Sequence, residues 1–443
     1  MSPVILFILG VVFVAVGIAV SIALHEVGHL VPAKLFKVRV TKYMIGFGPT
    51  IWSTKKGETE YGFKALPLGG YVSMIGMYPP NKVDGSVRPS STGMFQTLAS
   101  EARSMAHEDV GPGDEHRVFY RLPVWKKIII MLGGPAMNLL IGLVLTAVLL
   151  MGFGISEPTT TIADVSKCQV KVGETVDPNS ADCKPTPAAA AQLKPNDVIT
   201  AFDGKTVTSW DQLTGWIRAS AGKEVSITVV RNGSPVTSTV TPVLSARPVV
   251  GADGRQAKDD AGKLLYQDVG FLGIGAQTAL VPQPASSVLP MAGENIKQVA
   301  GVVLNLPARV VGVAKAAFSE EPRDPNGPIS VVGVGRVAGE VAAMEEVPAQ
   351  ARLAALVGLL AGLNFALAVF NLIPLLPLDG GHVAGALFEA VRRRVAKLFG
   401  KPDPGAFDIA KLLPVTYVVA ALLMGMGALL IYADIVKPVN LFG

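Results

Sequence analysis

The sequence predicts a polytopic α-helical membrane protein that carries one separate α+β domain. Half of the 443 residues are hydrophobic and 16% are charged, whereas an average soluble domain has about 25% charged residues. The apolar residues collect in four long blocks, and a turn-rich stretch of alternating polarity lies between the second and third. The net charge of +5 does not come from one basic, aromatic stripe, so nucleic-acid binding is not expected.

Each block is long enough to cross a bilayer as a helix, which takes about 20 apolar residues. The blocks are Pro3–Leu24, Ile128–Ser156, Leu353–Leu378 and Leu412–Ala433, and none contains a charged residue. The first block lacks a basic segment in front of it and is too long for the apolar core of a signal peptide. We therefore interpret it as a retained transmembrane helix.

Lysine and arginine indicate the orientation, because short cytoplasmic loops carry an excess of them. They are frequent between Val31 and Lys127 and again between the last two blocks, while no basic residue precedes Pro3. Four spanning helices place both basic segments on one side of the membrane, so we expect them in the cytoplasm. Both termini and the region from about 157 to 352 are then extracytoplasmic.

The extracytoplasmic region contains a predicted α+β unit. Val198–Phe202 is a short strand, Trp210–Ala219 has helical spacing, and strands on both sides of Asn232-Gly233 form a hairpin. The run Leu193-Lys-Pro-Asn-Asp-Val-Ile resembles a bacterial-type PDZ domain over roughly 160–245. No carboxylate-binding loop of the Gly-Leu-Gly-Phe type is evident.

The chemistry is expected at His25-Glu26-Val27-Gly28-His29, which continues the first apolar block. Residues four apart share one face of a helix, so both imidazoles can bind one metal ion. Glu26 then lies beside a metal-bound water as its general base. The plain alternative is a polar cluster at a helix end, but ionisable residues next to a spanning segment usually mark function.

Catalytic zinc usually has three protein ligands, so a third is needed. His107 and His116 lie in a polar cytoplasmic loop and are interpreted as solvated. Asp379 follows two prolines that break the third helix, where irregular backbone is tolerated only inside protein or at a wet cavity. We favour Asp379 as the third ligand, and His382 is the rival.

Taken together, these motifs carry a family resemblance. His25-Glu-x-x-His29 and Asn371-x-x-Pro-x-x-Pro-Leu-Asp379-Gly resemble the site-2 protease family of intramembrane zinc metalloproteases. The single PDZ-like insert and Gly133-Gly-Pro-x-x-Asn138 are similar to its bacterial regulator-of-sigma-E branch. The resemblance implies that Zn²⁺ is bound by the two histidines and Asp379, that Glu26 activates water, and that Asn371 holds the substrate backbone.

Glu60–Met74 alternates in polarity and is expected to turn near Gly69 and Gly70. The resemblance implies a hairpin at the membrane beside the site, whose exposed edge binds the substrate as an added strand. A plain cytoplasmic hairpin is the alternative.

Cys168 and Cys183 are expected to form a disulfide, because both lie in the extracytoplasmic domain, where oxidation persists. Two unpaired thiols are the alternative.

The predicted fold is thus four transmembrane helices with a cytoplasmic membrane-associated β-hairpin and one extracytoplasmic PDZ-like α+β domain. Along the chain we expect a first transmembrane helix with the zinc motif (1–36), a cytoplasmic loop with the hairpin (37–125), a second transmembrane helix (126–156), the PDZ-like domain (160–245), a linker with amphipathic helices (246–350), a third transmembrane helix with the Asn and Asp-Gly motif (351–382), a cytoplasmic loop (383–411) and a fourth transmembrane helix (412–434). The polar stretch 78–121 has no assigned role.

The expected function is hydrolysis of peptide bonds within or next to transmembrane segments of single-pass membrane proteins. The resemblance implies substrates such as anti-sigma factors or remnant signal peptides, trimmed beforehand by an upstream protease, in the inner (plasma) membrane of a bacterium. The alternatives are a membrane metal transporter and a catalytically silent PDZ scaffold. Glu26 and the PDZ-like insert speak against the first, and an intact Glu26 speaks against the second.

Overall fold

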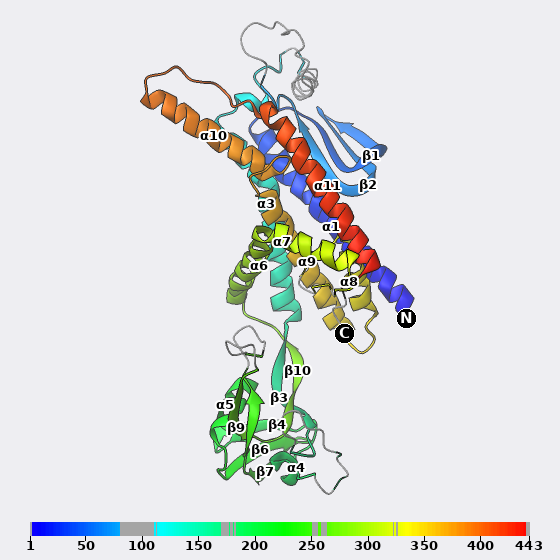
Figure 1. Ribbon diagram of the computed structural model, residues 1–443, viewed down its shortest axis with the longest axis vertical. Coiled ribbons are helices and arrows are strands. Elements are labelled where there is room, and N and C mark those ends of the chain that lie inside the picture. Colours follow the sequence, from blue (N-terminus) through cyan, green and yellow to red (C-terminus); the bar gives the residue numbers. More distant parts are fainter. Residues whose placement is uncertain are drawn as a thin grey trace. The chain divides into compact units, whose positions relative to one another are not determined.

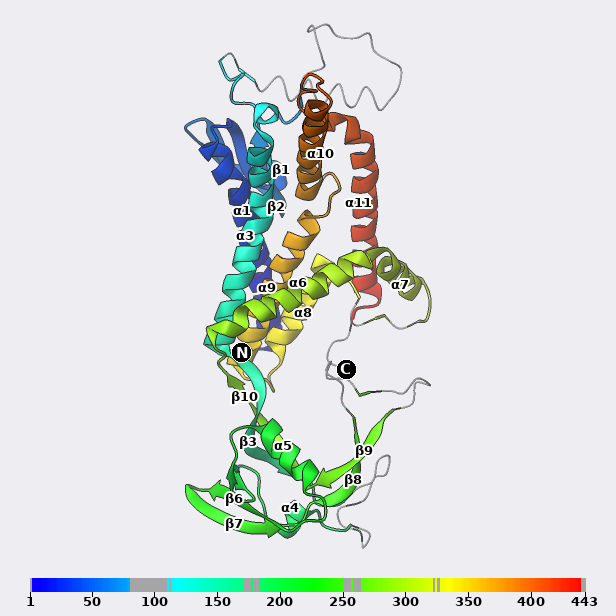
Figure 2. The same ribbon diagram turned by 90° about the vertical axis from the view of Figure 1, so that its left-hand side faces the viewer.

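The computed structural model describes residues 2–79, 110–111, 113–169, 177, 180, 183–249, 256–257, 264–321, 323–324 and 327–439. Most of the stretch 78–121, including His107, therefore lies outside the described residues. The chain divides into two units. The first combines residues 1–153 with 283–443, and the second is the insert 154–282 (Figures 1 and 2).

Four helices of the first unit are long and apolar enough to cross a membrane, as expected. They are α1 (Pro3–Leu35), α3 (Val124–Ala147) with its continuation η2 (Val148–Phe153), α9 (Ala349–Asn371), and α11 (Leu413–Val436) with the short helix η4 (Ile409–Leu412) before it. In the most apolar window of α9, 44% of the residues are buried, against 17–22% in the other three. Because α9 has the largest buried share, it is the central helix of the four. Lipid can solvate the apolar side chains that the other three helices expose.

The first unit is held together by close helix packing. Helix α1 packs along α3 and along α8 (Val331–Ala343), while α3 also packs against α9 and α10 (Asp379–Leu398). A β-carbon on Gly28 would lie 2.2 Å from the carbonyl oxygen of Gly133, and one on Gly133 would lie 1.9 Å from that of Gly28. Glycine at both positions therefore lets the backbones of α1 and α3 touch.

Two predicted limits in this unit were wrong. The third apolar segment is not one helix to residue 382, because α9 ends at Asn371 and irregular backbone with two prolines precedes α10. The stretch 383–411 is not simply a loop, since α10 continues to Leu398. Its arginines exclude it as an apolar span, but it still buries a stripe that contains Gly385, Ala386 and Glu389.

The expected hairpin is present, and the chain reverses direction at more than one place in it. β1 (Val40–Lys56) pairs with β2 (Thr59–Met74), and the pairing ends where Lys56 meets Thr59 around Gly57, whose φ is +66°. A second reversal lies near Gly69 and Gly70, as predicted. Lys42–Ile45 pairs in the same direction with Glu60–Phe63 and in the opposite direction with Gly70–Ser73, so the chain turns between these two parts of β2. Figure 1 shows the sheet beside the C-terminal half of α1.

Residues 285–318 are helical, within the linker where amphipathic helices were expected. The short helix η3 (Ala285–Ser287) leads into α6 (Val288–Leu304), and α7 (Leu306–Phe318) follows at a bend of 70°. The 3₁₀ helix η1 (Phe119–Arg121) precedes α3.

The second unit is a six-stranded sheet in the order β10-β3-β4-β6-β7, with β5 paired to β4. Its elements are β3 (Ile155–Val165), α4 (Pro187–Ala190), β4 (Val198–Phe202), β5 (Lys205–Thr206), α5 (Trp210–Ala219), β6 (Val225–Arg231), β7 (Ser234–Val240) and β10 (Ile274–Val281). A separate hairpin joins β8 (Val243–Pro248) to β9 (Tyr266–Phe271). The predicted limits 160–245 were too narrow, because β10 completes the sheet by pairing with β3.

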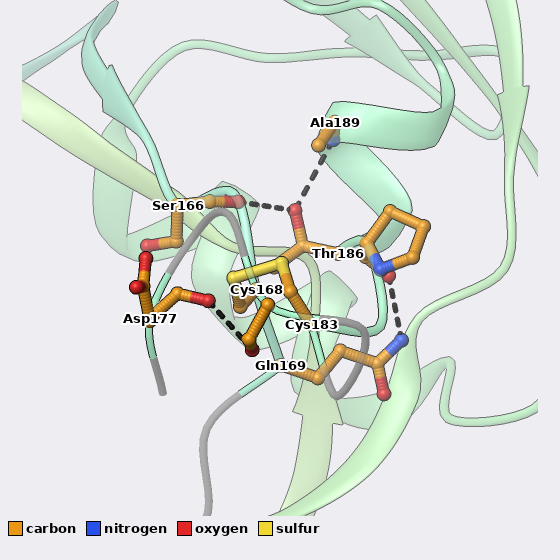
Figure 3. Close-up of a disulfide and its surroundings, with 9 residues drawn as sticks. Ser166, Cys168, Gln169, Asp177, Cys183, Thr186 and Ala189 are labelled. Atoms are coloured by element: carbon orange, nitrogen blue, oxygen red, sulfur yellow. Dashed lines mark hydrogen bonds between the residues drawn. A yellow bond between two sulfur atoms is a disulfide. The ribbon is translucent and has the colours of Figure 1, made fainter. Parts of the chain in front are cut away.

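A disulfide joins Cys168 and Cys183 in this unit, as predicted (Figure 3). Next to them, the Thr186 hydroxyl donates a hydrogen bond to the carbonyl of Ser166 and accepts one from the amide of Ala189 at the start of α4. The disulfide and this hydrogen-bonded threonine together tie the chain after β3 to the start of α4.

Candidate metal centre

His25 and His29 lie one turn apart on α1 and are both buried, as the spacing predicted. Their Nε2 atoms are 3.2 Å apart. Oδ2 of Asp379, from the first residue of α10, lies 3.3 Å from Nε2 of His25 and 3.4 Å from Nε2 of His29. The fold thus brings the two histidine nitrogens of α1 together with a carboxylate oxygen from a residue 350 or more positions later in the sequence.

The tautomer of His29 suits metal binding. Its Nδ1 lies 2.8 Å from the carbonyl oxygen of Ile130 on α3. Since a carbonyl only accepts hydrogen bonds, Nδ1 carries the proton and donates it, and the lone pair of Nε2 points toward Asp379. Such a bond fixes the orientation of a metal-binding imidazole.

Asp379 reaches the histidines because the chain folds tightly just before it. A β-carbon on Gly380 would lie 2.4 Å from the carbonyl oxygens of Leu372 and Ile373, and one on Gly381 would lie 2.5 Å from the amide of Leu376. The two glycines after Asp379 therefore allow α10 to begin directly against the irregular backbone that follows α9.

The three atoms fit a zinc ion. Ligands about 2.0–2.1 Å from a tetrahedral ion lie about 3.3 Å from one another, which matches the separations of 3.2–3.4 Å. Two imidazole nitrogens and one carboxylate oxygen are a ligand set of catalytic zinc and leave a fourth position open. Among the described residues, Oδ2 of Asp379 is buried without a hydrogen bond, and a cation at this point would satisfy it.

Glu26 is buried beside the histidines and lies under the hairpin. A β-carbon on Gly70 of β2 would lie 2.8 Å from Cγ of Glu26 and 3.3 Å from its Oε1. Glycine at position 70 therefore lets the strand pass directly over the Glu26 side chain. Gly69, with φ of +123°, lies against the ring of Phe47.

Two hydrogen bonds fasten the hairpin to α1. The Tyr43 hydroxyl donates to the carbonyl oxygen of Ala23 at 2.8 Å, and the Lys34 ammonium donates to the Tyr61 hydroxyl at 2.6 Å. Burial, with the nearby Glu26 charge as a smaller cause, raises the pKa of Tyr43 to about 12. The Tyr43 hydroxyl therefore keeps its proton, and the bond it makes, at any physiological pH.

The three candidate ligand residues and Glu26 line one cavity of about 510 Å³. It contains the predicted residues His25, Glu26, His29, Asp379, Asn371, Gly69 and Gly70. His382 also lines it but is not in the cluster of three ligand atoms, which lie within 4.8 Å of one another. His116 is exposed and lies outside the cavity.

The cavity also contains residues to which the sequence assigned no role. Ile22, Met131, Asn138 and Leu367 line it, and a β-carbon on Gly134 would lie 2.3 Å from Nε2 of His29. Gly134 and Asn138 belong to the motif that begins at Gly133, but its spacing alone does not say which residues face the metal centre.

Comparisons with known proteins agree with this geometry. The model of peptidase family M50 matches residues 13–401. The chain belongs to peptidase family M50. Zinc metalloprotease Rip1 of Mycobacterium tuberculosis H37Rv is 33% identical over 99% of this chain and all of its own. Rip1 of Mycolicibacterium smegmatis is 32% identical over the same shares, and Metalloprotease MmpA of Caulobacter vibrioides is 27% identical over 88% of each chain.

Family M50 membership makes this protein a zinc metalloprotease of the site-2 protease family, with Zn²⁺ as its cofactor. Its four apolar helices are those of a membrane protein. The membership disfavours the two alternatives from the sequence, a metal transporter and a silent scaffold.

Proposed function

We propose that this M50 protease cuts peptide bonds within or next to the transmembrane segments of single-pass membrane proteins. The observation that carries the proposal is the position of the ligand cluster: His25 and His29 are buried on α1, one of the helices able to cross a membrane. A substrate that reaches them comes from the bilayer or from its immediate surface.

In this proposal His25, His29 and Asp379 hold the zinc ion, which polarises the scissile carbonyl and lowers the pKa of a coordinated water when bound. The Glu26 carboxylate takes the proton from the attacking water and passes it to the leaving amine. Burial of Glu26 beneath Gly70 keeps bulk solvent away from this proton.

A helical substrate hides its peptide bonds, so it has to unwind before attack. Residues 69–72 and 74 of β2 line the cavity, and an unwound peptide can pair with this stretch as an added strand. Asn371, at the end of α9, lines the same cavity and hydrogen-bonds the substrate main chain.

We place the protein in the bacterial inner membrane, with both termini and the insert 154–282 outside the cytoplasm. The distribution of lysine and arginine supports this orientation. The substrates are anti-sigma factors or remnant signal peptides that an upstream protease has already shortened. The insert is PDZ-like and excludes substrates with bulky outer domains. The competing role for it is docking, in which it captures a newly made C-terminus.

The test is cleavage of a panel of transmembrane peptides by the purified protein in detergent, with and without a chelator. The matched control is Glu26→Gln, which is nearly isosteric but cannot accept the proton. We expect cleavage only by the zinc-loaded wild type, and a rate at least about 100-fold lower for Glu26→Gln at unchanged zinc content. Wild-type turnover by Glu26→Gln would contradict the mechanism, and cleavage of soluble peptides alone would contradict the substrate class.

A further inference from the structure

Asn138 on α3 is a buried amide to which the reaction described above assigns no role. Its side chain is 1% exposed, and it lines the same cavity as Glu26 and the three ligand residues. Neither its Oδ1 nor its Nδ2 has a hydrogen-bond partner among the described residues. A buried polar group without a partner is costly, so this amide needs a ligand that the chain itself does not supply.

The position of Asn138 on α3 places it next to the reacting groups. Gly134, one turn earlier, lies against His25 and His29, and residues four apart share one face of a helix. Asn138 therefore projects from the face of α3 that contacts the two histidines.

A second buried amide shows what a structural asparagine looks like in this fold. Asn364 on α9 is also 1% exposed. Its Nδ2 donates to Oγ of Ser21 at 3.0 Å and to the carbonyl oxygen of Leu360 at 2.9 Å, and it is not among the residues that line the cavity. Asn364 ties α9 to α1, whereas Asn138 makes no comparable bond within the described chain.

We propose that Asn138 is a substrate-binding residue whose amide hydrogen-bonds the main chain of the peptide being cut. An unwound peptide in this cavity presents N–H and C=O groups that have lost their helical partners, and an amide side chain offers both an acceptor and donors. Asn138 hydrogen-bonds the peptide from α3, and Asn371 does so from α9. The inference rests on the proposed function, because it requires an extended peptide in this cavity.

The first test measures the binding of a labelled transmembrane peptide to the zinc-loaded Glu26→Gln protein, so that no cleavage occurs. Adding Asn138→Leu, which is similar in volume and apolar, should weaken binding about tenfold. Zinc content should stay the same, and the unfolding temperature should not fall because an unpaired buried amide is removed. The control Asn364→Leu should do the reverse: peptide affinity is retained and the unfolding temperature falls.

The second test changes the peptide instead of the protein. Replacing single backbone amides near the scissile bond by esters removes one N–H at a time. One of these esters should weaken binding to the protein with Asn138 but not to the Asn138→Leu protein, which is the signature of a direct contact.

The outcomes separate this proposal from the proposed function. If Asn138→Leu leaves peptide affinity unchanged, and each ester weakens binding equally with and without it, the role of Asn138 is overturned while the proposed function stands. Loss of folding or of zinc in both Asn138→Leu and the smaller Asn138→Ser shows that the amide holds helices together, and this also overturns it. If the reference protein binds no transmembrane peptide and the wild type cuts none, the proposed function fails and the role of Asn138 fails with it.

Discussion

Glycines decide how closely the proposed zinc ligands and Glu26 approach one another and their neighbours. Gly134 lets α3 lie against both histidines, and Gly70 lets β2 pass over Glu26. Gly380 and Gly381 allow the fold that carries Asp379 to the same point. Because each contact leaves no room for a β-carbon, these positions control the geometry of the centre although glycine has no functional group.

Gly70→Ala should therefore impair catalysis without removing the metal. The new methyl carbon would lie 2.8 Å from Cγ of Glu26, so the carboxylate or the strand must move. We expect the cleavage rate to fall about 100-fold, as a displaced catalytic group predicts, while zinc content stays the same. The control is Gly362→Ala on α9, where an added β-carbon meets nothing within 4 Å. An active Gly70→Ala protein would show that the strand does not constrain Glu26.

Asp379→Asn should lower the affinity for zinc, because a neutral amide oxygen replaces an anionic ligand. His382→Ala should retain zinc, since His382 lies in the cavity but outside the ligand cluster. Metal content after dialysis against graded chelator measures both effects. The reverse pattern, with metal lost only from His382→Ala, would make His382 the third ligand.

At the scale of elements, the insert depends on an ion pair between strands. The buried Asp197 carboxylate, just before β4, accepts hydrogen bonds from Nε and Nη2 of Arg231 on β6 at 2.8 and 2.7 Å, and one from the amide of Lys194 at 2.8 Å. The Arg231 guanidinium holds the pKa of Asp197 below its usual range. These bonds join the turn before β4 to the end of β6.

This ion pair predicts acid sensitivity. The folded pKa of Asp197 is lower than that of the unfolded chain, which is about 3.9, so its stabilisation is fully present above pH 4 and is lost as the pH falls further. Asp197→Asn should lower the unfolding temperature of the insert by about 5 °C at pH 7 and flatten its acid dependence. Hydrogen exchange of the backbone amides in β4 and β6, recorded in the full chain as a function of pH, measures this loss of stability. The control Asp203→Asn lies in an exposed turn, and an equal effect there would exclude the ion pair as the cause.

At the scale of the whole molecule, the role of the insert can be tested by removing it. The amide of Gln283 donates to the carbonyl oxygen of Leu150 at 2.8 Å, so the two ends of the first unit lie close together and a short Gly/Ser linker can replace residues 154–282. Removal of 160–245 alone would cut β3 in the middle and leave the first half of β10 without its partner. If the insert excludes bulky substrates, the shortened protein should still cut a trimmed substrate and should newly cut the untrimmed one.

The docking role predicts the opposite result for the shortened protein. It would fold and bind zinc, but it would lose cleavage of the trimmed substrate. Zinc content and the unfolding temperature of the remaining helices are the controls, because a protein that has lost either cannot distinguish the two roles.

The spacing of neighbouring residues alone identified the four apolar helices, the pair His25 and His29 with Glu26 between them, and the strands around Asn232. Helical and strand periodicities are local, so they are visible in one stretch of sequence. Asp379 was selected because prolines break a long apolar run, which is also a local signal.

Only the tertiary structure decided which distant residues meet. It placed Asp379 within 3.4 Å of both histidines, laid Gly70 over Glu26, added a turn at Gly57 to the hairpin, and added β10 to the sheet of the insert. It also left the Asn138 amide unpaired in the cavity. These results depend on how closely two backbones approach and in which register they pair, and such contacts between distant segments leave no periodic trace in the sequence.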